Sequence, residues 1–271
     1  MSTNLYGLLG EKLMHSYSPE IHNMIFKNLN INGSYSLIST KKDELKNTIN
    51  TLKEKGFIGV NVTIPYKIES MKYLDHISKE AQKIGAVNTI YFSKDGIWGY
   101  NTDYYGFLSL IEKNSINVCG SKALILGTGG ASKAVYHALI DKGIDEVLFA
   151  SRTKKNFKKN IISYDEIMFL KGYDIIINCT PVGMYPNVNI SPVNKAYLKN
   201  FNTAIDLIYN PHETLFIKYA KESNLKYANG LYMLISQAVK SQEIWNSIII
   251  PAETAEIIYK KLLGVCDIPN K

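Results

Sequence analysis

The stretch Lys122-Ala-Leu-Ile-Leu-Gly-Thr-Gly-Gly-Ala-Ser132 decides the fold of this chain. The mainly apolar residues 122–126 predict a buried strand, and a helix is predicted to begin near Ser132. Glycines between the two let the backbone turn tightly and approach a pyrophosphate, which the amide groups at a helix N-terminus can hold. No Gly-Lys-Ser/Thr follows, so the turn is not a P-loop. The segment predicts a dinucleotide-binding site, with contacts from Gly127, Thr128, Gly129, Gly130 and Ala131.

Arg152 follows the next predicted strand, residues 146–150, and is the one arginine among 31 basic residues. An acidic residue at this place binds the adenosine ribose of NAD, whereas an arginine suits the 2′-phosphate of NADP. A lysine-biased composition could place one arginine here by chance, so the position carries more weight than the rarity. Lysines at 154, 155, 158 and 159 add positive charge beside it, although Lys158 and Lys159 could equally form a solvated face. We therefore expect NADP as the cofactor.

The pattern of apolar residues changes near residue 104. Before it, predicted strands at 5–9, 35–38, 59–62 and 89–92 alternate with predicted helices at 19–28 and 42–55. After it, a helix from about 104 leads to near-continuous apolar strands at 122–126, 146–150, 174–179, 204–208 and 227–228, as in a parallel sheet covered on both faces. Helices at 231–245 and 252–263 close the chain. We expect an α/β protein of two domains, a Rossmann-like parallel-sheet NADP-binding domain at 104–237 and an α/β substrate domain made of 1–103 and 238–271.

Composition excludes several classes of protein. The 271 residues are 46% hydrophobic and 20% charged, which is typical of a globular protein. No run of about 18 apolar residues occurs, and the first residues lack the features of a signal peptide, so we expect a cytoplasmic protein without a membrane partner. The net charge of +7 comes from evenly spread lysines without a zinc-finger or RNA-binding pattern, so no nucleic-acid partner is expected. Three scattered cysteines and five isolated histidines predict neither a disulfide framework nor a metal site.

Candidate chemical groups lie mostly in the first hundred residues. Thr63, Pro65 and Lys67 follow a predicted strand, an arrangement that can hold an ammonium at the rim of a sheet. Asn88 and Asp103 add an amide and a carboxylate near other strand ends. Such polar groups often cap turns, and Lys67 is one lysine among many, so residue types alone leave both interpretations open.

At this point the sequence resembles the shikimate dehydrogenase family in nine blocks, in the order of that family and over nearly the whole chain. These blocks are His15-Ser16-Tyr17-Ser18-Pro19 with Ile21-His22-Asn23, Asn61-Val-Thr63-Ile-Pro65-Tyr-Lys67, Gly85-Ala-Val-Asn88-Thr89, Asn101-Thr102-Asp103, Gly127-Thr-Gly-Gly-Ala131, Ser151-Arg-Thr153, Asn178-Cys-Thr180 with Gly183-Met184, Asp206-Leu-Ile-Tyr209-Asn-Pro211, and Gly230-Leu-Tyr-Met233 with Gln237.

The resemblance implies a reversible, NADPH-dependent reduction of 3-dehydroshikimate to shikimate, in the route to chorismate and aromatic amino acids. It makes Lys67 and Asp103 the catalytic pair, although Asp103 could act only by orienting Lys67 and the substrate. It implies that the substrate is bound by Ser16, Ser18, Thr63, Asn88, Tyr209 and Gln237. Ser18 could instead only cap a helix. It further implies cofactor contacts by Ser151, Arg152, Thr153, Lys155, Thr180, Leu207 and Gly230 in addition to the glycine turn.

The chain departs from the family pattern beside Arg152. Ser151 stands where the family often has asparagine, and Asn156 stands where it has a second arginine, so discrimination between NADP and NAD could be weaker than usual. The alternatives are an enzyme that also oxidises quinate with relaxed cofactor use, and a non-catalytic sensor of shikimate-type ligands. Lys67 and Asp103 argue against the sensor. A monomer or a homodimer is expected.

Overall fold

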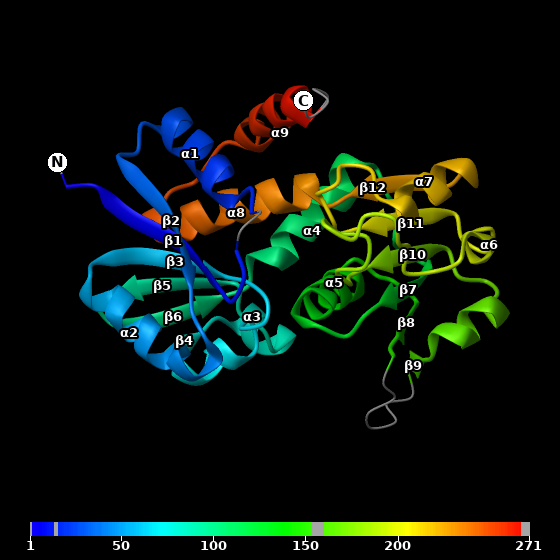
Figure 1. Ribbon diagram of the computed structural model, residues 1–271, viewed down its shortest axis with the longest axis horizontal. Coiled ribbons are helices and arrows are strands. Elements are labelled where there is room, and N and C mark those ends of the chain that lie inside the picture. Colours follow the sequence, from blue (N-terminus) through cyan, green and yellow to red (C-terminus); the bar gives the residue numbers. More distant parts are fainter. Residues whose placement is uncertain (1, 14–15, 153–159, 267–271) are drawn as a thin grey trace. The chain divides into compact units, whose positions relative to one another are not determined.

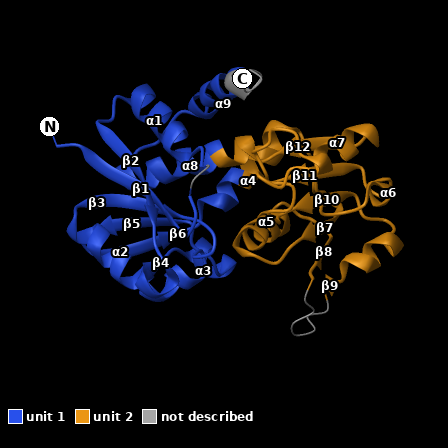
Figure 2. Ribbon diagram, viewed as in Figure 1, with its two compact units in different colours: residues 1–106, 235–271 blue, residues 107–234 orange. Residues whose placement is uncertain are grey.

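The computed structural model describes residues 2–13, 16–152 and 160–266. The chain divides into two compact units, Met1–Gly106 with Ile235–Lys271, and Phe107–Leu234 (Figure 2). Both passages between the units lie inside helices, α4 (Thr102–Lys113) and α8 (Leu231–Asn246) (Figure 1). The first unit is thus discontinuous in sequence and has internal ends at Gly106 and Ile235.

The sheet of the first unit is mixed. Among the described residues its strand order is β2-β1-β3-β5-β6-β4. Strands β1, β2 and β3 pair in parallel, β5 is antiparallel to both β3 and β6, and β4 is parallel to β6. The strand bounds are β1 Asn4–Gly10, β2 Gly33–Ser39, β3 Phe57–Val62, β4 His76–Ile77, β5 Thr89–Ser93 and β6 Gly96–Tyr100. Strands β4 and β6 were not predicted, because one has two residues and the other contains two glycines.

Helices of the first unit begin and end at recognisable signals. Ser78 caps α3 through the amide of Ala81, and Gly85 ends it in a left-handed conformation. The helix predicted at 42–55 is a 3-10 turn followed by α2, and Lys55 is its C-cap. The bounds are α1 Ser18–Leu29, η1 Lys42–Glu44, α2 Leu45–Glu54, η2 Glu69–Tyr73, α3 Lys79–Ile84 and α9 Glu253–Cys266.

Both faces of this sheet are covered, because successive side chains of a strand point to opposite faces. One face buries Leu9, Val60 and Val62 in a cluster with the apolar side of α2, and the other buries Tyr6 and Leu8 with residues of α1 and α8. The C-terminal helices therefore complete the unit that the first hundred residues begin.

Gly59 of β3 makes room for the tryptophan of α8. A Cβ atom at this position would lie 2.0 Å from Nε1 of Trp245, which donates a hydrogen bond to the carbonyl of Ile90 at 2.8 Å. Trp245 also packs on Tyr6, with ring centroids 5.2 Å apart. The absent side chain at position 59 thus decides how closely α8 approaches the sheet.

The sheet of the second unit is entirely parallel among the described residues, in the order β12-β11-β10-β7-β8-β9. The first strand in sequence, β7, lies in the middle, and the chain winds outward to β9 on one side and from β10 to β12 on the other. This is the doubly wound Rossmann order, with its switch point between β7 and β10. The bounds are β7 Lys122–Leu126, β8 Glu146–Ala150, β9 Ile161–Ile162, β10 Ile175–Asn178, β11 Thr203–Asp206 and β12 Lys226–Asn229.

Helices cover both faces of this second sheet. Leu124, Ile176 and Ala204 are buried in one cluster with Phe216 of α7. Their neighbours Ile125, Ile177 and Ile205, which point to the opposite face, are equally inaccessible to solvent. The bounds are α5 Gly130–Asp141, η3 Tyr164–Phe169, α6 Lys195–Leu198 and α7 Leu215–Glu222. The expected Rossmann-like sheet is confirmed.

Candidate active site

The topology of the first unit gathers its candidate residues at one edge of the sheet. Strands β1 and β3 are parallel, so the segments that follow them, with Ser18 and Lys67, leave the sheet at the same edge. Strand β5 is antiparallel to β3 and begins there, directly after Asn88. Strand β6 is antiparallel to β5 and ends there, just before Asp103. Segments far apart in sequence therefore meet at one edge.

Lys67 and Asp103 form an ion pair at this edge. Nζ of Lys67 lies 2.6 Å from Oδ2 of Asp103, and the two side chains are 17% and 9% exposed. Asp103 lies in the first turn of α4, where the helix dipole favours negative charge. A lysine ammonium has three donors, so a partner on one of them leaves donors for a substrate oxygen.

The loop that carries Lys67 is anchored at this residue and at the residue before it. The carbonyl of Lys67 accepts a hydrogen bond from the amide of Val87 at 2.7 Å. The preceding Tyr66 is 1% exposed, and its hydroxyl donates to the carbonyl of Thr40 at 2.7 Å. The ammonium therefore extends from a backbone that the core holds in place.

Asn88 fixes the other oxygen of Asp103. The backbone amide of Thr102 donates to Oδ1 of Asn88 at 2.6 Å, so this atom is the amide oxygen. The nitrogen Nδ2 of Asn88 donates to Oδ1 of Asp103 at 2.9 Å. Asp103 thus contacts Lys67 with one oxygen and Asn88 with the other, and Asn88 itself is 3% exposed.

Ser16 and Ser18 present neighbouring hydroxyls, whose oxygens are 3.1 Å apart. The N-cap residue of α1 is Tyr17, and no side chain caps the helix there, so Ser18 does not serve as its N-cap. Thr63 lies against the end of β1, where a Cβ on Gly10 would be 2.6 Å from its methyl carbon. Glycine at that position lets the segment after β1 approach Thr63 closely.

The last two predicted substrate residues belong to different units. Gln237 lies on α8 in the first unit and is 7% exposed, and its Oε1 accepts from Nδ2 of Asn88 at 3.5 Å. Tyr209 is half-buried in the second unit, in the segment after β11. The structure therefore places Gln237 in the group formed by the first unit, whereas Tyr209 belongs to the second unit.

The glycine turn of the second unit suits a pyrophosphate. Gly127 has a φ of +97°, and a Cβ on it would lie 2.9 Å from the methyl of Thr180. Helix α5 begins at Gly130, two residues before the predicted start, and its first turn contains no acidic residue. Gly129 is the N-cap, and a Cβ there would meet nothing within 4 Å. Open space beside unpaired helix amides fits an anionic group of the cofactor.

Arg152 lies two residues after the end of β8 and is exposed. Burial raises the pKa of Tyr164, and the positive charge of Arg152 opposes that rise, so the guanidinium lies near this phenol. The amide of Ser151 donates to the carbonyl of Ile162 at 3.0 Å, which holds the segment beside β9. An exposed guanidinium at this strand end fits a 2′-phosphate. Thr153 and Lys155, also predicted to contact the cofactor, lie outside the described residues, as do Lys154, Asn156, Lys158 and Lys159.

Thr180, Leu207 and Gly230 lie in the segments that follow β10, β11 and β12, at the carboxyl edge of the sheet. The hydroxyl of Thr180 donates to Oδ1 of Asn178 at 2.6 Å, and the amide of Leu207 donates to the carbonyl of Asn178 at 3.0 Å. A Cβ on Gly230 would lie 1.9 Å from the carbonyl oxygen of Leu207, so these two backbones are in direct contact.

A buried carboxyl group without a predicted role supports this edge. Asp206 is inaccessible to solvent and accepts hydrogen bonds from Nδ2 of Asn178 at 2.9 Å and from the hydroxyl of Thr214 at 2.6 Å. Burial nevertheless raises the pKa of Asp206 to about 7. The sequence does contain a signal for this pair, because Asn178 and Asp206 are each a polar residue at the end of an apolar strand.

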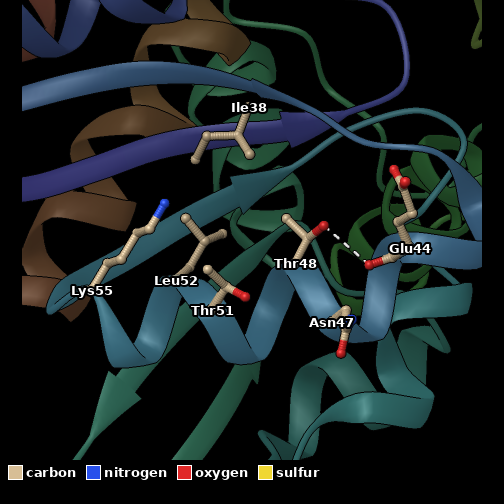
Figure 3. Close-up of a pocket in the computed structure, with 7 residues that line it drawn as sticks. All are labelled: Ile38, Glu44, Asn47, Thr48, Thr51, Leu52 and Lys55. Atoms are coloured by element: carbon tan, nitrogen blue, oxygen red, sulfur yellow. Dashed lines mark hydrogen bonds between the residues drawn. The ribbon is translucent and has the colours of Figure 1, made fainter.

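A surface pocket of about 300 Å³ lies along α2 (Figure 3). Its lining residues are Ile38, Glu44, Asn47, Thr48, Thr51, Leu52 and Lys55. None of them is a predicted site residue. Within residues 2–13, 16–152 and 160–266, no three His, Cys, Asp or Glu side chains are grouped so that they could hold a metal ion. The same part of the chain contains no helix long and apolar enough to cross a membrane.

A doubly wound sheet with a glycine turn, in one chain with a lysine–aspartate pair, defines the class of nicotinamide-dependent dehydrogenases. The chain belongs to the shikimate dehydrogenase family. It is 50% identical over 246 residues to the shikimate dehydrogenase (NADP(+)) of Clostridium beijerinckii, which covers 89% of this chain and 91% of the relative. Residues 8–90 match the family model described as the shikimate dehydrogenase substrate binding domain.

Solved structures agree with this assignment. A chorismate mutase/shikimate 5-dehydrogenase fusion protein from Clostridium acetobutylicum superimposes with a TM-score of 0.94 at 47% identity, over 98% of this chain and 99% of the other. Shikimate 5-dehydrogenase from Thermus thermophilus, in complex with NADP(H) and shikimate, gives a TM-score of 0.83 at 30% identity, over 96% and 99% of the two chains. The two-domain α/β architecture is that of the family.

Proposed function

We propose that this chain catalyses the reversible reduction of 3-dehydroshikimate to shikimate with NADPH, in the route to chorismate and the aromatic amino acids. The observation that carries the proposal is the contact of Lys67 with Asp103 at an edge where Asn88 and the Ser16–Ser18 segment also emerge. The Clostridium beijerinckii relative is named shikimate dehydrogenase (NADP(+)), and the Thermus thermophilus structure is a complex with NADP(H) and shikimate. These names favour neither quinate nor a sensor role.

The chemistry requires a proton donor at the substrate carbonyl. When bound, NADPH supplies a hydride to the carbonyl carbon, and the electron pair of the C=O bond moves to the oxygen. The Lys67 ammonium donates a proton to that oxygen while negative charge develops on it. Asp103 orients the ammonium, and Asn88 orients Asp103. In the reverse direction the neutral amine of Lys67 accepts the hydroxyl proton.

The remaining residues bind the substrate and the cofactor. The hydroxyls of Ser16 and Ser18 hold the substrate carboxylate, while Thr63, Asn88, Tyr209 and Gln237 bind its ring hydroxyls or carboxylate. The amide groups at the N-terminus of α5 would hold the pyrophosphate of the cofactor, and Arg152 would pair with its 2′-phosphate. The full set of proposed cofactor contacts is Gly127, Thr128, Gly129, Gly130, Ala131, Ser151, Arg152, Thr153, Lys155, Thr180, Leu207 and Gly230.

The proposal extends to the organisation of the protein. Residues 1–103 with 238–271 form the substrate domain, and residues 104–237 form the NADP-binding domain. The enzyme acts in the cytoplasm as a monomer or a homodimer, without a nucleic-acid partner. Light scattering after size-exclusion chromatography would give the mass, and a higher oligomer would contradict this part of the proposal.

A direct assay tests the activity. The purified chain is incubated with shikimate or quinate and with NADP⁺ or NAD⁺, and reduced nicotinamide is followed by its absorbance. We expect the highest kcat/KM for shikimate with NADP⁺. No turnover of shikimate with either cofactor would contradict the proposed function, and a preference for quinate would reassign the substrate.

A further inference from the structure

Three buried hydroxyls meet behind the lysine–aspartate pair. The hydroxyl oxygens of Thr89 and Thr102 are 3.1 Å apart, and that of Ser241 lies 3.0 Å from the first and 3.2 Å from the second. All three residues are inaccessible to solvent. They come from β5, from the first residue of α4 and from α8, and we call them the hydroxyl cluster. Neither the sequence pattern nor the proposed mechanism gives them a role.

The partners of the cluster fix the direction of its hydrogen bonds. Ser241 donates to the carbonyl of Gln237 at 2.9 Å, so its oxygen is an acceptor towards its other neighbours. Nδ2 of Asn61 donates to this oxygen at 2.8 Å. The orientation of Asn61 is itself set, because its Oδ1 accepts from the hydroxyl of Tyr35 at 2.8 Å. The orientation of each group is therefore set by the hydrogen bond that its neighbour makes.

The cluster ends on Asn88. The hydroxyls of Thr89 and Thr102 lie 3.1 Å and 3.2 Å from Oδ1 of Asn88 and can donate to it. Each threonine hydroxyl has one hydrogen, so one of them can donate to this amide oxygen while the other donates to Ser241. Together with the backbone amide of Thr102, this holds the amide oxygen and leaves Nδ2 facing Asp103. Through Ser241 the same cluster ties α8, which carries Gln237, to β5 and to the start of α4.

We propose that the hydroxyl cluster is a positioning device for the catalytic pair, with Ser241 as its central residue. It turns the Asn88 amide so that Asp103 is held with one oxygen towards Lys67. The hydrogen bonds of the three hydroxyls lead to Asn88, so their effect on Asp103 passes through that amide. The inference rests on the proposed function, because it assumes that Lys67 and Asp103 carry out the proton transfer.

The first test compares two substitutions on one helix. Ser241→Ala removes the central hydroxyl, whereas Ser236→Ala removes a hydroxyl that is also buried but has no hydrogen-bond partner among the described residues. We expect Ser241→Ala to lower kcat about tenfold, the size of one or two neutral hydrogen bonds. Ser236→Ala should stay within about twofold of the parent. The dissociation constant for NADPH should not change in either variant.

A second pair of variants remains informative if Ser241→Ala does not fold. Thr89→Val keeps the shape of the side chain without the hydroxyl, and Thr89→Ser keeps the hydroxyl without the methyl. A positioning role predicts that Thr89→Val loses kcat about tenfold while Thr89→Ser retains it. A role in packing alone predicts that the serine variant is affected as much as the valine variant.

The isotope effect separates positioning from stability. With NADPH deuterated at the transferred hydrogen, Ser241→Ala and Thr89→Val should show a larger primary isotope effect on kcat than the parent, because the chemical step has become slower. Lower melting temperatures with unchanged kcat and isotope effect would overturn the inference. If the parent chain does not turn over shikimate, the proposed function itself fails, and if Lys67→Ala keeps normal turnover, Lys67 is not the proton donor. If Lys67→Ala is inactive but Ser241→Ala behaves like Ser236→Ala, only this inference fails.

Discussion

The contact between Lys67 and Asp103 brings the proposed proton donor and its proposed orienting carboxylate together, with Nζ and Oδ2 2.6 Å apart. Each partner is attached to a different rigid element, Lys67 to the anchored loop after β3 and Asp103 to the first turn of α4. Groups held in this way need little rearrangement when charge develops on a substrate oxygen, which is how preorganised sites accelerate a reaction. Substitution of either side chain should therefore lower the reaction rate.

Lys67→Ala should lower kcat by a factor of about 10²–10⁴, the usual contribution of general acid–base catalysis. Lys72→Ala is a matched control, because Lys72 is a nearby lysine that is 65% exposed and pairs with Glu69. Steady-state kinetics with saturating NADPH and circular dichroism of both variants provide the measurement. A Lys67→Ala variant with turnover like that of Lys72→Ala would exclude Lys67 as the donor.

Arg152→Gln should lower kcat/KM for NADPH by about 10–10², since a charge-assisted hydrogen bond contributes about 1.5–3 kcal/mol and each ~1.4 kcal/mol is a factor of ten. With NADH, which lacks the 2′-phosphate, the same substitution should change kcat/KM by about twofold at most, because no charge-assisted bond is lost. Equal losses with the two cofactors would show that Arg152 acts on the fold and not on the phosphate.

At the scale of elements, the carboxyl ends of β10 and β11 are joined through Asp206. This carboxyl accepts from Asn178, Thr214 and the amide of Ile208, and burial still raises its pKa to about 7. The unfolded chain, with an aspartate pKa of about 4, binds fewer protons than the folded chain between these values. The free energy of unfolding therefore falls as the pH rises from about 4 through 7 and Asp206 ionises. The loss is on the order of 4 kcal/mol.

Asp206→Asn should remove this pH dependence, because an amide stays neutral. We expect the free energy of unfolding of the parent to fall between pH 5 and pH 8 by several kcal/mol more than that of Asp206→Asn. Urea denaturation followed by far-ultraviolet circular dichroism measures it, since both tryptophans, Trp98 and Trp245, belong to the first unit. Asp165→Asn, at an exposed acid of η3, is the control and should follow the parent.

Elements with a strong local signal were predictable, and those set by distant contacts were not. The apolar strands and the glycine turn indicate the parallel sheet, because burial on both faces leaves few polar positions. Helix α7 has eight residues, too few for a clear period, although its cap at Thr214 is a usable signal. The strand ends indicated where Lys67 and Asn88 lie. Ser241 gave no signal, because its partners Thr89 and Asn61 are 152 and 180 positions away in the chain.

At the scale of the whole molecule, the first unit depends on both ends of the sequence. Tyr6 of β1 donates a hydrogen bond to Oδ1 of Asn246 at 2.7 Å, and Trp245 packs against its ring. His22 of α1 stacks on Tyr35 with centroids 4.0 Å apart and bonds to Gln242 of α8 at 2.8 Å. Helix α8 thus contributes core residues as well as Gln237 and Ser241.

Gly59→Ala should reduce both stability and turnover, although Gly59 belongs to no proposed site. The added methyl would meet Nε1 of Trp245 and displace α8, and overpacking of a core typically costs about 1–3 kcal/mol. The control is Gly264→Ala on α9, where a Cβ meets nothing within 4 Å, so this substitution adds a methyl group without overpacking. Gly56→Ala is a poorer control, because Gly56 has a φ of +75°, which strains any other residue. An unchanged melting temperature of Gly59→Ala would contradict the close packing of Trp245 against Gly59.

The packing of Trp245 against Gly59 also has a consequence for folding during synthesis. A ribosome releases the strands of the first sheet early, but the indole and the helix that cover one of their faces emerge only after the second unit has been synthesised. Until α8 is made, Tyr6, Phe26 and Tyr35 of the nascent unit lack the packing of Trp245. The first unit is thus the first to begin and the last to be completed. A chaperone would be needed most while this unit is incomplete.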